Sequence, residues 1–174
     1  MLLFDPTNPS NVLQHWSRRR VMAAVLAVAA SSACTHVETT RAPLVLFVCE
    51  FGTVKSAVSR EVFRRRAAER KIAAAAFSRG LTVEDHASPV LQRMLAADGI
   101  DPKSDPAAPL TAADWQRADI LVWFNPLPPQ VRHPDMRDWS DLPSFNDRYT
   151  IARPLLERRI DLLLDELASP RRKK

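Results

Sequence analysis

Short apolar runs alternate with stretches of helical periodicity along most of this 174-residue chain. The run at 44–48 is continuously apolar, which is typical of a strand buried on both faces of a sheet. Further strands are predicted over 73–77 and 120–124, with a short edge strand near 136–139. The helical spacing of apolar residues predicts four helices, over 56–72, 89–97, 111–117 and 149–167.

Capping residues support two of these helices. Ser88 stands directly before Pro89 and Gly99 follows the end of the pattern, so the second helix has signals at both ends. Thr111 is placed as the cap of the third helix. In the last helix, the spacing of large apolar residues predicts an inner face made of Leu155, Leu156, Ile160, Leu163, Leu164 and Leu167.

Strands that alternate with helices indicate parallel βαβ units with right-handed crossovers. We therefore predict an α/β fold, a three-layer sandwich in which helices flank a central, mainly parallel four-stranded sheet. Ligands of such sheets bind at the carboxyl ends of the strands. The first strand leads directly to Cys49, which places this thiol where a ligand is expected.

The first 43 residues differ in character from the rest of the chain. Three arginines at 18–20 precede an Ala- and Val-rich stretch and a segment of small residues that leads to Cys34. This order predicts a twin-arginine-like export signal and a disordered arm over 1–43, with Cys34 as a lipidation site for membrane anchoring. We expect an exported, periplasmic or lipid-anchored protein, or a cytoplasmic one if the leader is not functional. The globular domain is predicted over 44–168, and a basic tail over 169–174.

Composition narrows the possible functions. A hydrophobic share of 46% can fill a sizeable core, and a formal net charge of +5 suits anionic substrates. Much of the excess charge lies at 18–20 and 171–174, and no basic-aromatic platform appears, so nucleic-acid binding is not expected. The four histidines are scattered without metal-ligand spacing, and we expect neither a metal site nor a cofactor.

The most informative segment follows the first strand. Five residues separate Cys49 from Lys55, and a helical pattern starts at Ser56. A strand, a short loop and a helix N-terminus in this order bring backbone N–H groups around one point and favour an anion there. The helix end and the Lys55 cation also favour the thiolate form of Cys49, which makes it a candidate nucleophile. A buried strand-end thiol and a disulfide between Cys34 and Cys49 are the alternative interpretations.

The spacing of Cys49, five residues, Lys55 and Ser56 resembles the phosphate loop of the low-molecular-weight protein tyrosine phosphatases and of the arsenate reductases that share their fold. The signature of this superfamily, phosphotyrosine phosphatase I, is Cys, five residues, Arg, then Ser or Thr, directly after the first strand. The segment 110–122 is similar to a family segment in which Leu-Thr precedes a short helix and Ala-Asp precedes a strand. The closing helix after Trp139 also fits the family pattern.

Three departures from the family pattern mark a divergent member. Lys55 replaces the arginine, and its single ammonium cannot make the bidentate contact of a guanidinium with two phosphate oxygens. Gly52 replaces the loop asparagine, and glycine accepts the positive φ expected there. The family's general acid is an Asp followed by Pro in a late loop. That pair is missing here, and Asp141 is its nearest substitute, with a loop-capping role as the alternative.

The resemblance implies a role for each of these residues. Cys49 attacks phosphorus, and Ser56 donates a hydrogen bond to its thiolate. Lys55 balances the negative charge of the phosphate, and Asp141 protonates the leaving group. The phosphate-binding loop is expected to comprise Cys49, Glu50, Phe51, Gly52, Thr53, Val54 and Lys55.

These roles predict a cysteine-dependent phosphatase that hydrolyses phosphotyrosine or aryl phosphate monoesters through a cysteinyl-phosphate intermediate, with an activity weakened by Lys55. The expected partners are a phosphorylated protein or a small aryl phosphate, with inorganic phosphate or arsenate as a ligand. One alternative is an arsenate reductase that uses an external thiol, because the predicted domain has no further cysteine for an internal relay. The other is a non-catalytic module that binds phosphate or another oxyanion.

Overall fold

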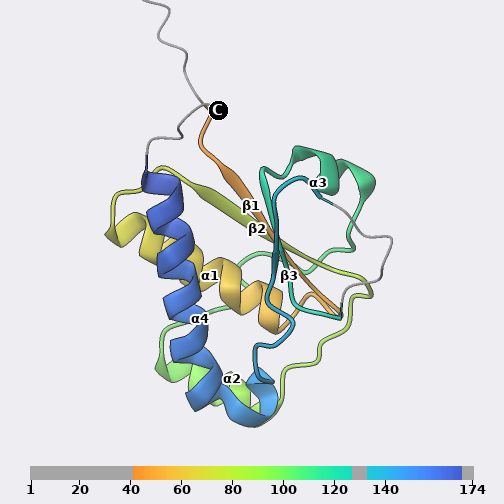
Figure 1. Ribbon diagram of the computed structural model, residues 1–174. Helices are drawn as coiled ribbons and strands as arrows, with labels where there is room; N and C mark the ends of the chain where they lie inside the picture. The colour runs from red at the N-terminus through yellow and green to blue at the C-terminus, as the bar shows by residue number, and fades with distance from the viewer. Residues whose placement is uncertain (1–40, 127–132, 170–174) are drawn as a thin grey trace, which may run out of the picture. The chain divides into compact units, whose positions relative to one another are not determined.

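The computed structural model describes residues 41–126 and 133–169 (Figure 1). Four strands form one sheet in which all neighbouring strands are parallel. The strands are β1 (Leu44–Cys49), β2 (Ala75–Gly80), β3 (Ile120–Trp123) and β4 (Met136–Asp138), in the order β2-β1-β3-β4. The helices are α1 (Lys55–Glu69), α2 (Pro89–Ala97), α3 (Ala112–Arg117) and α4 (Phe145–Ala168). The predicted α/β class with a parallel four-stranded sheet is confirmed.

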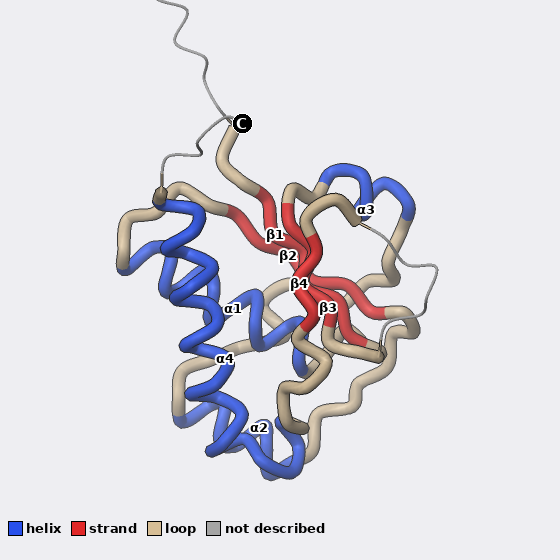
Figure 2. Tube along the Cα trace, in the orientation of Figure 1, coloured by secondary structure: helices blue, strands red, loops and turns tan. Residues whose placement is uncertain are grey.

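The side chains of β1 point alternately to the two faces of the sheet, and each face has its own apolar core. Val45, Phe47 and Cys49 lie in the larger core, together with residues of α1, α2 and α4. Leu46 and Val48 lie in the smaller core on the side of α3. Figure 2 shows the strands between α3 and the other three helices. The continuous apolar run of β1 is thus explained by burial on both faces.

The predicted caps of α2 and α3 are confirmed. The Ser88 hydroxyl accepts a hydrogen bond from the Leu91 N–H at 3.2 Å, and Pro89 occupies the first position of the helix. Thr111 and Asp114 form a reciprocal capping box at the start of α3. Both caps satisfy backbone donors that a helix leaves unpaired at its N-terminus.

The second strand lies later in the sequence than its apolar run predicts. It occupies Ala75–Gly80 rather than 73–77, and its register pairs Leu44 with Ala75 and Cys49 with Gly80. Backbone pairing with β1, rather than side-chain hydrophobicity, decides where this strand ends. β2 therefore ends beside the loop that follows Cys49.

The last helix differs from its prediction in two respects. α4 begins at Phe145 rather than Tyr149, and a kink at Arg148 separates its first turn from the rest. Leu155 is 42% exposed, so its predicted place on the inner face is wrong. Successive residues are about 100° apart around a helix, so Leu155 and Leu156 cannot both point to the core. Leu156 is the one that is buried. The buried face comprises Leu156, Ile160, Leu163 and Leu164, with Leu167 partly buried against them.

Some predictions fall on residues outside the described ranges. The export signal and Cys34 lie within 1–40, and most of the basic tail lies within 170–174. In the described part of the chain, no helix combines the length and the apolar character that a bilayer crossing requires. No observation supports membrane anchoring, and the export signal stays a prediction.

Arg60 is a core residue that the apolar pattern does not predict. It is 1% exposed, although it belongs to an arginine-rich helix, α1. Its guanidinium donates to the carbonyl oxygens of Pro102 and Asp105, at 2.8 and 3.1 Å, and to the Ser78 hydroxyl at 2.8 Å. Glu61 supplies a carboxylate 2.8 Å from Nε. These bonds attach the segment after α2 to both α1 and β2.

Replacing Arg60 by methionine is expected to lower the free energy of unfolding by about 2–4 kcal/mol, because buried carbonyl and hydroxyl groups lose their donor. Urea unfolding measures the change. Arg93→Met is the matched control, since it removes the same charge from an exposed position of α2 and is expected to cost less than about 0.5 kcal/mol. Equal effects of both substitutions would contradict a stabilising role of the buried contacts.

Candidate active site

The loop from Cys49 to Lys55 lies at the carboxyl end of β1, and its close neighbour β2 restricts its shape. Gly52 has a φ of +71°, in the left-handed region that favours glycine. A Cβ on Gly52 would lie 2.8 Å from the backbone nitrogen of Gly80. The positive φ expected at Gly52 is confirmed, and the contact with Gly80 is a second reason for glycine there.

The segment after β2 holds this loop from one side. The Leu81 N–H donates to the Glu50 carbonyl at 2.9 Å. The Thr53 hydroxyl donates to the Glu84 carbonyl at 2.7 Å and accepts a hydrogen bond from the His86 N–H at 3.3 Å. The segment therefore bonds to a carbonyl and a hydroxyl group of the loop and leaves the loop's own N–H groups without a partner among the described residues.

These N–H groups are the part of the loop that remains for a ligand. Within the described residues, no amide from Glu50 to Lys55 donates to a backbone carbonyl. α1 begins at Lys55 without a side-chain cap, so no capping side chain takes up the first amides of this helix. Open amides in a loop and at a helix N-terminus favour an anion.

Cys49 stands at the start of the loop with a free thiol, and the residue is 6% exposed. Its Sγ lies 3.1 Å from the Oγ of Ser56, which is fully buried in the first turn of α1. A hydroxyl at this distance can donate to a thiolate. The structure thus brings the expected nucleophile and its expected donor together.

Lys55 provides the cation of the loop. Its Nζ donates to the carbonyl oxygen of Leu142 at 2.6 Å, in the segment before α4. Burial lowers the pKa of Lys55 from its usual value, and the negative charges of Cys49 and Asp141 oppose this effect. An anion bound in the loop would compete with the Leu142 carbonyl for the ammonium.

Asp141 forms an ion pair with Arg159 and is close enough to Lys55 for the two charges to interact. Its carboxylate accepts hydrogen bonds from two nitrogens of Arg159, at 2.8 and 2.5 Å, and its side chain is 68% exposed. The hydrogen bonds from Arg159 lower the pKa of Asp141, which favours the carboxylate over the proton-carrying acid. The predicted role of Asp141 as general acid stays a prediction, and its pairing with Arg159 favours another proton donor. The pairing was not visible in the sequence, because Arg159 comes from α4, 18 residues later.

A pocket of about 170 Å³ opens at the loop. Its lining comes from the loop, from the segment after β2, from the end of β3 and from the start of α4. The residues that line it are Cys49, Glu50, Phe51, Val54, Lys55, His86, Phe124, Asn125, Ser144, Phe145 and Asn146.

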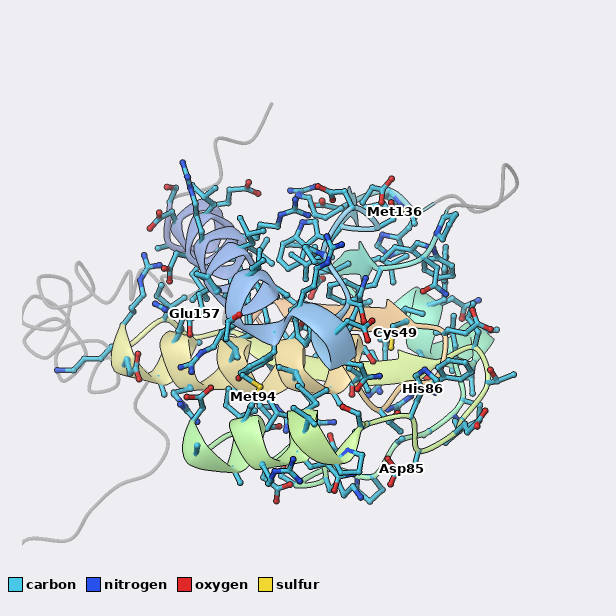
Figure 3. All side chains as sticks on the ribbon, turned by 90° about the horizontal axis from the view of Figure 1, so that it is seen from below. Cys49, Asp85, His86, Met94, Met136 and Glu157 are labelled. Atoms are coloured by element: carbon cyan, nitrogen blue, oxygen red, sulfur yellow. The ribbon has the colours of Figure 1, made fainter. Side chains whose placement is uncertain are left out.

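Four polar residues of this lining were missed by sequence reasoning: His86, Asn125, Ser144 and Asn146. The Asn125 Nδ2 donates to the Glu50 carboxylate at 2.9 Å, and the His86 ring lies 4.4 Å from the Phe51 ring, centroid to centroid. The Asn146 amide donates to the His86 carbonyl at 2.8 Å. Figure 3 shows His86 on the segment beside the end of β1 that carries Cys49. Only the position of each residue after a strand or before a helix could have indicated these contacts.

A larger cavity of about 440 Å³ includes Thr53 in its lining. α2 and the segment 99–103 supply most of its mainly apolar walls. Neither Cys49 nor Lys55 lines it, whereas the smaller pocket contains both, and chemistry needs a nucleophile beside an anion site. Over 41–126 and 133–169, no three His, Cys, Asp or Glu side chains are grouped as a metal site requires. The smaller pocket is therefore the candidate active site.

The fold and this loop define a class of α/β proteins in which a cysteine ends the first strand and a short loop leads from it to a helix. Similar solved structures include a protein tyrosine phosphatase from Entamoeba histolytica, with 14% identity, a TM-score of 0.61 and coverage of 76% of this chain and 100% of the other. An arsenate reductase in the phosphate binding state has 20% identity, a TM-score of 0.59 and coverage of 72% and 99%. A low molecular weight protein tyrosine phosphatase from T. tengcongensis has 19% identity, a TM-score of 0.53 and coverage of 72% and 99%.

Residues 44–126 match the family model described as low molecular weight phosphotyrosine protein phosphatase. No curated protein matches the sequence. The predicted resemblance is confirmed: residues 44–126 match the phosphatase family model, and the fold is similar to those of low molecular weight protein tyrosine phosphatases and of arsenate reductases.

Replacing Gly52 by alanine is expected to displace the loop, because the new Cβ would meet the Gly80 nitrogen at 2.8 Å. Inorganic phosphate should then protect Cys49 from iodoacetamide about tenfold less well, equivalent to about 1.4 kcal/mol of lost binding. Gly99→Ala is the matched control. Gly99 also has a positive φ, of +62°, but its added Cβ would meet only the Arg65 side chain, at 3.9 Å. Equal losses of protection in both variants would contradict the role of the Gly80 contact.

Proposed function

We propose that this protein is a cysteine-dependent phosphatase that hydrolyses phosphotyrosine or aryl phosphate monoesters. The family-model match and the similar solved structures support either a phosphatase or an arsenate reductase. The observation that carries the proposal is the 3.1 Å contact between Cys49 Sγ and Ser56 Oγ, beside a loop with open amides. A thiol that only fills a core needs neither a buried hydroxyl partner nor an anion site next to it.

In the proposed reaction, the Cys49 thiolate attacks the phosphorus of the bound ester. The P–O bond to the leaving group breaks, and a cysteinyl phosphate forms. The loop amides and the Lys55 ammonium stabilise the negative charge on the phosphate oxygens. Water then attacks phosphorus and the P–S bond breaks, while the Ser56 hydroxyl stabilises the departing thiolate.

The pocket walls favour an aromatic leaving group. Phe51, Phe124 and Phe145 line the pocket, and the His86 ring lies against that of Phe51. An aryl ring can pack against such walls, with edge or offset contacts to the rings. A phosphorylated tyrosine of a protein, or a small aryl phosphate, is therefore the proposed substrate.

An arsenate reductase that uses an external thiol is the second candidate. The open loop amides suit any tetrahedral oxyanion, and one structural relative is an arsenate reductase in the phosphate binding state. Cys49 is the only cysteine between residues 41 and 169, so a separate thiol would have to supply the electrons. Arsenate-dependent oxidation of glutathione, measured beside aryl phosphate hydrolysis, separates the two activities.

The protein is expected to hydrolyse 4-nitrophenyl phosphate under reducing conditions, and Cys49→Ser to lower kcat by at least about 10³-fold, because the covalent step is lost. Release of 4-nitrophenolate measures turnover, and calorimetric titration measures phosphate binding. Phosphate binding without turnover in the unchanged protein would refute the phosphatase function and indicate a non-catalytic oxyanion-binding module.

Lys55→Arg is expected to raise kcat/KM for aryl phosphates about 10- to 100-fold, since a guanidinium makes two parallel hydrogen bonds to the phosphate where an ammonium cannot. Lys55→Gln is the matched control, with a lower kcat/KM than the unchanged protein because it removes the charge. Steady-state kinetics with 4-nitrophenyl phosphate measure both. A decrease in Lys55→Arg would show that the missing guanidinium does not limit this site.

A further inference from the structure

The leaving group of an aryl phosphate needs a proton, and Asp141 is poorly placed to supply it. Arg159 binds its carboxylate, and the pocket lining does not include Asp141 among the described residues. The lining contains four ionisable side chains, which are the candidates for the proton donor: Cys49, Glu50, Lys55 and His86.

Three of the four have another role or partner. Cys49 is the nucleophile of the proposed reaction. The Glu50 carboxylate accepts a hydrogen bond from the Asn125 amide at 2.9 Å. The Lys55 ammonium donates to a backbone carbonyl at 2.6 Å and supplies the positive charge for the phosphate. His86 is the group that remains.

His86 is anchored at the pocket by its backbone. Its N–H donates to the Thr53 hydroxyl at 3.3 Å, and its carbonyl accepts a hydrogen bond from the Asn146 amide at 2.8 Å. One anchor belongs to the loop of the nucleophile and the other to α4, so the residue is held from both sides. Its ring lies 4.4 Å from the Phe51 ring, centroid to centroid, and the residue is exposed at the pocket (Figure 3).

We propose that His86 is the general acid and base of this site, a catalytic residue that acts on the leaving oxygen; this inference rests on the proposed phosphatase function. As the Cys49 thiolate forms the P–S bond, the P–O bond breaks and the leaving oxygen takes the proton of the His86 imidazolium. The neutral imidazole then takes a proton from the water that attacks phosphorus, and the P–S bond breaks to restore the thiolate. Imidazole suits both steps, because one of its forms donates a proton and the other accepts one.

The test compares two substrates that differ in their need for a proton. The 4-nitrophenolate ion leaves readily without one, whereas the more basic phenolate of phosphotyrosine does not. In His86→Gln, kcat/KM is expected to fall about 100-fold for phosphotyrosine and less than about fivefold for 4-nitrophenyl phosphate. The ratio kcat/KM is the right quantity, because it reports P–O cleavage even where hydrolysis of the cysteinyl phosphate limits kcat.

Asp141→Asn is the matched variant, and it is expected to change kcat/KM for both substrates by the same factor. Phosphate protection of Cys49 from iodoacetamide is expected to persist in His86→Gln, which reports an intact loop. A selective loss for phosphotyrosine in Asp141→Asn instead of His86→Gln would overturn the inference. An equal loss for both substrates in His86→Gln, or a loss of phosphate protection there, would overturn it as well, since His86 would then act only by holding the loop.

Failure of the proposed function gives a different result from failure of the His86 assignment. If the unchanged protein binds phosphate but hydrolyses neither substrate, the phosphatase function is refuted, and the assignment of His86 with it. If the unchanged protein hydrolyses both substrates and His86→Gln has no leaving-group dependence, only the assignment of His86 is refuted.

Discussion

The contact between the backbones of Gly52 and Gly80 is the constraint on which the site depends. β1 and β2 end side by side, with Cys49 paired to Gly80, so the chain that leaves Cys49 must pass directly over the end of β2. A Cβ on either glycine would lie 2.8 Å from the backbone nitrogen of the other. Because no side chain separates these segments, the residues after β2 can hydrogen-bond the loop's carbonyl and hydroxyl oxygens. The loop's N–H groups then remain for an anion.

In the site that we propose, backbone amides rather than side-chain charges supply most of the groups that could bind an anion. The chain has a formal net charge of +5, yet Lys55 is the only Lys or Arg in the described lining. Arginines of α1 are engaged elsewhere: Arg60 holds the segment after α2, and Arg66 pairs with Glu157 and Asp161 of α4. These pairs contribute to the contact between helices and leave the site with one cation, which a carbonyl already holds.

Sequence reasoning worked best where the physical cause is local. The caps Ser88 and Thr111 bond to amides three residues away, and the apolar run of β1 reports burial on both faces. Sequence reasoning failed where a partner far away in the sequence decides the bounds of a strand or the burial of a side chain. The hydrophobic pattern predicts the wrong bounds for β2, because pairing with β1 decides where the strand ends. The apolar pattern does not place the charged Arg60 in the core, yet it is buried there with acceptors more than forty residues away in the sequence.

The sequence by itself determined the α/β class, the order of strands and helices and the cysteine loop, because each of these depends on residues within a few positions of one another. Only the tertiary structure decided which side chains meet at the loop. Asn125 reaches Glu50 across 75 residues, and the Thr53 hydroxyl meets the Glu84 carbonyl across 31. Asp141 pairs with Arg159 of α4, 18 residues later in the sequence, and does not line the described pocket. Such contacts depend on how strands and helices pack, and no local pattern of residues encodes them.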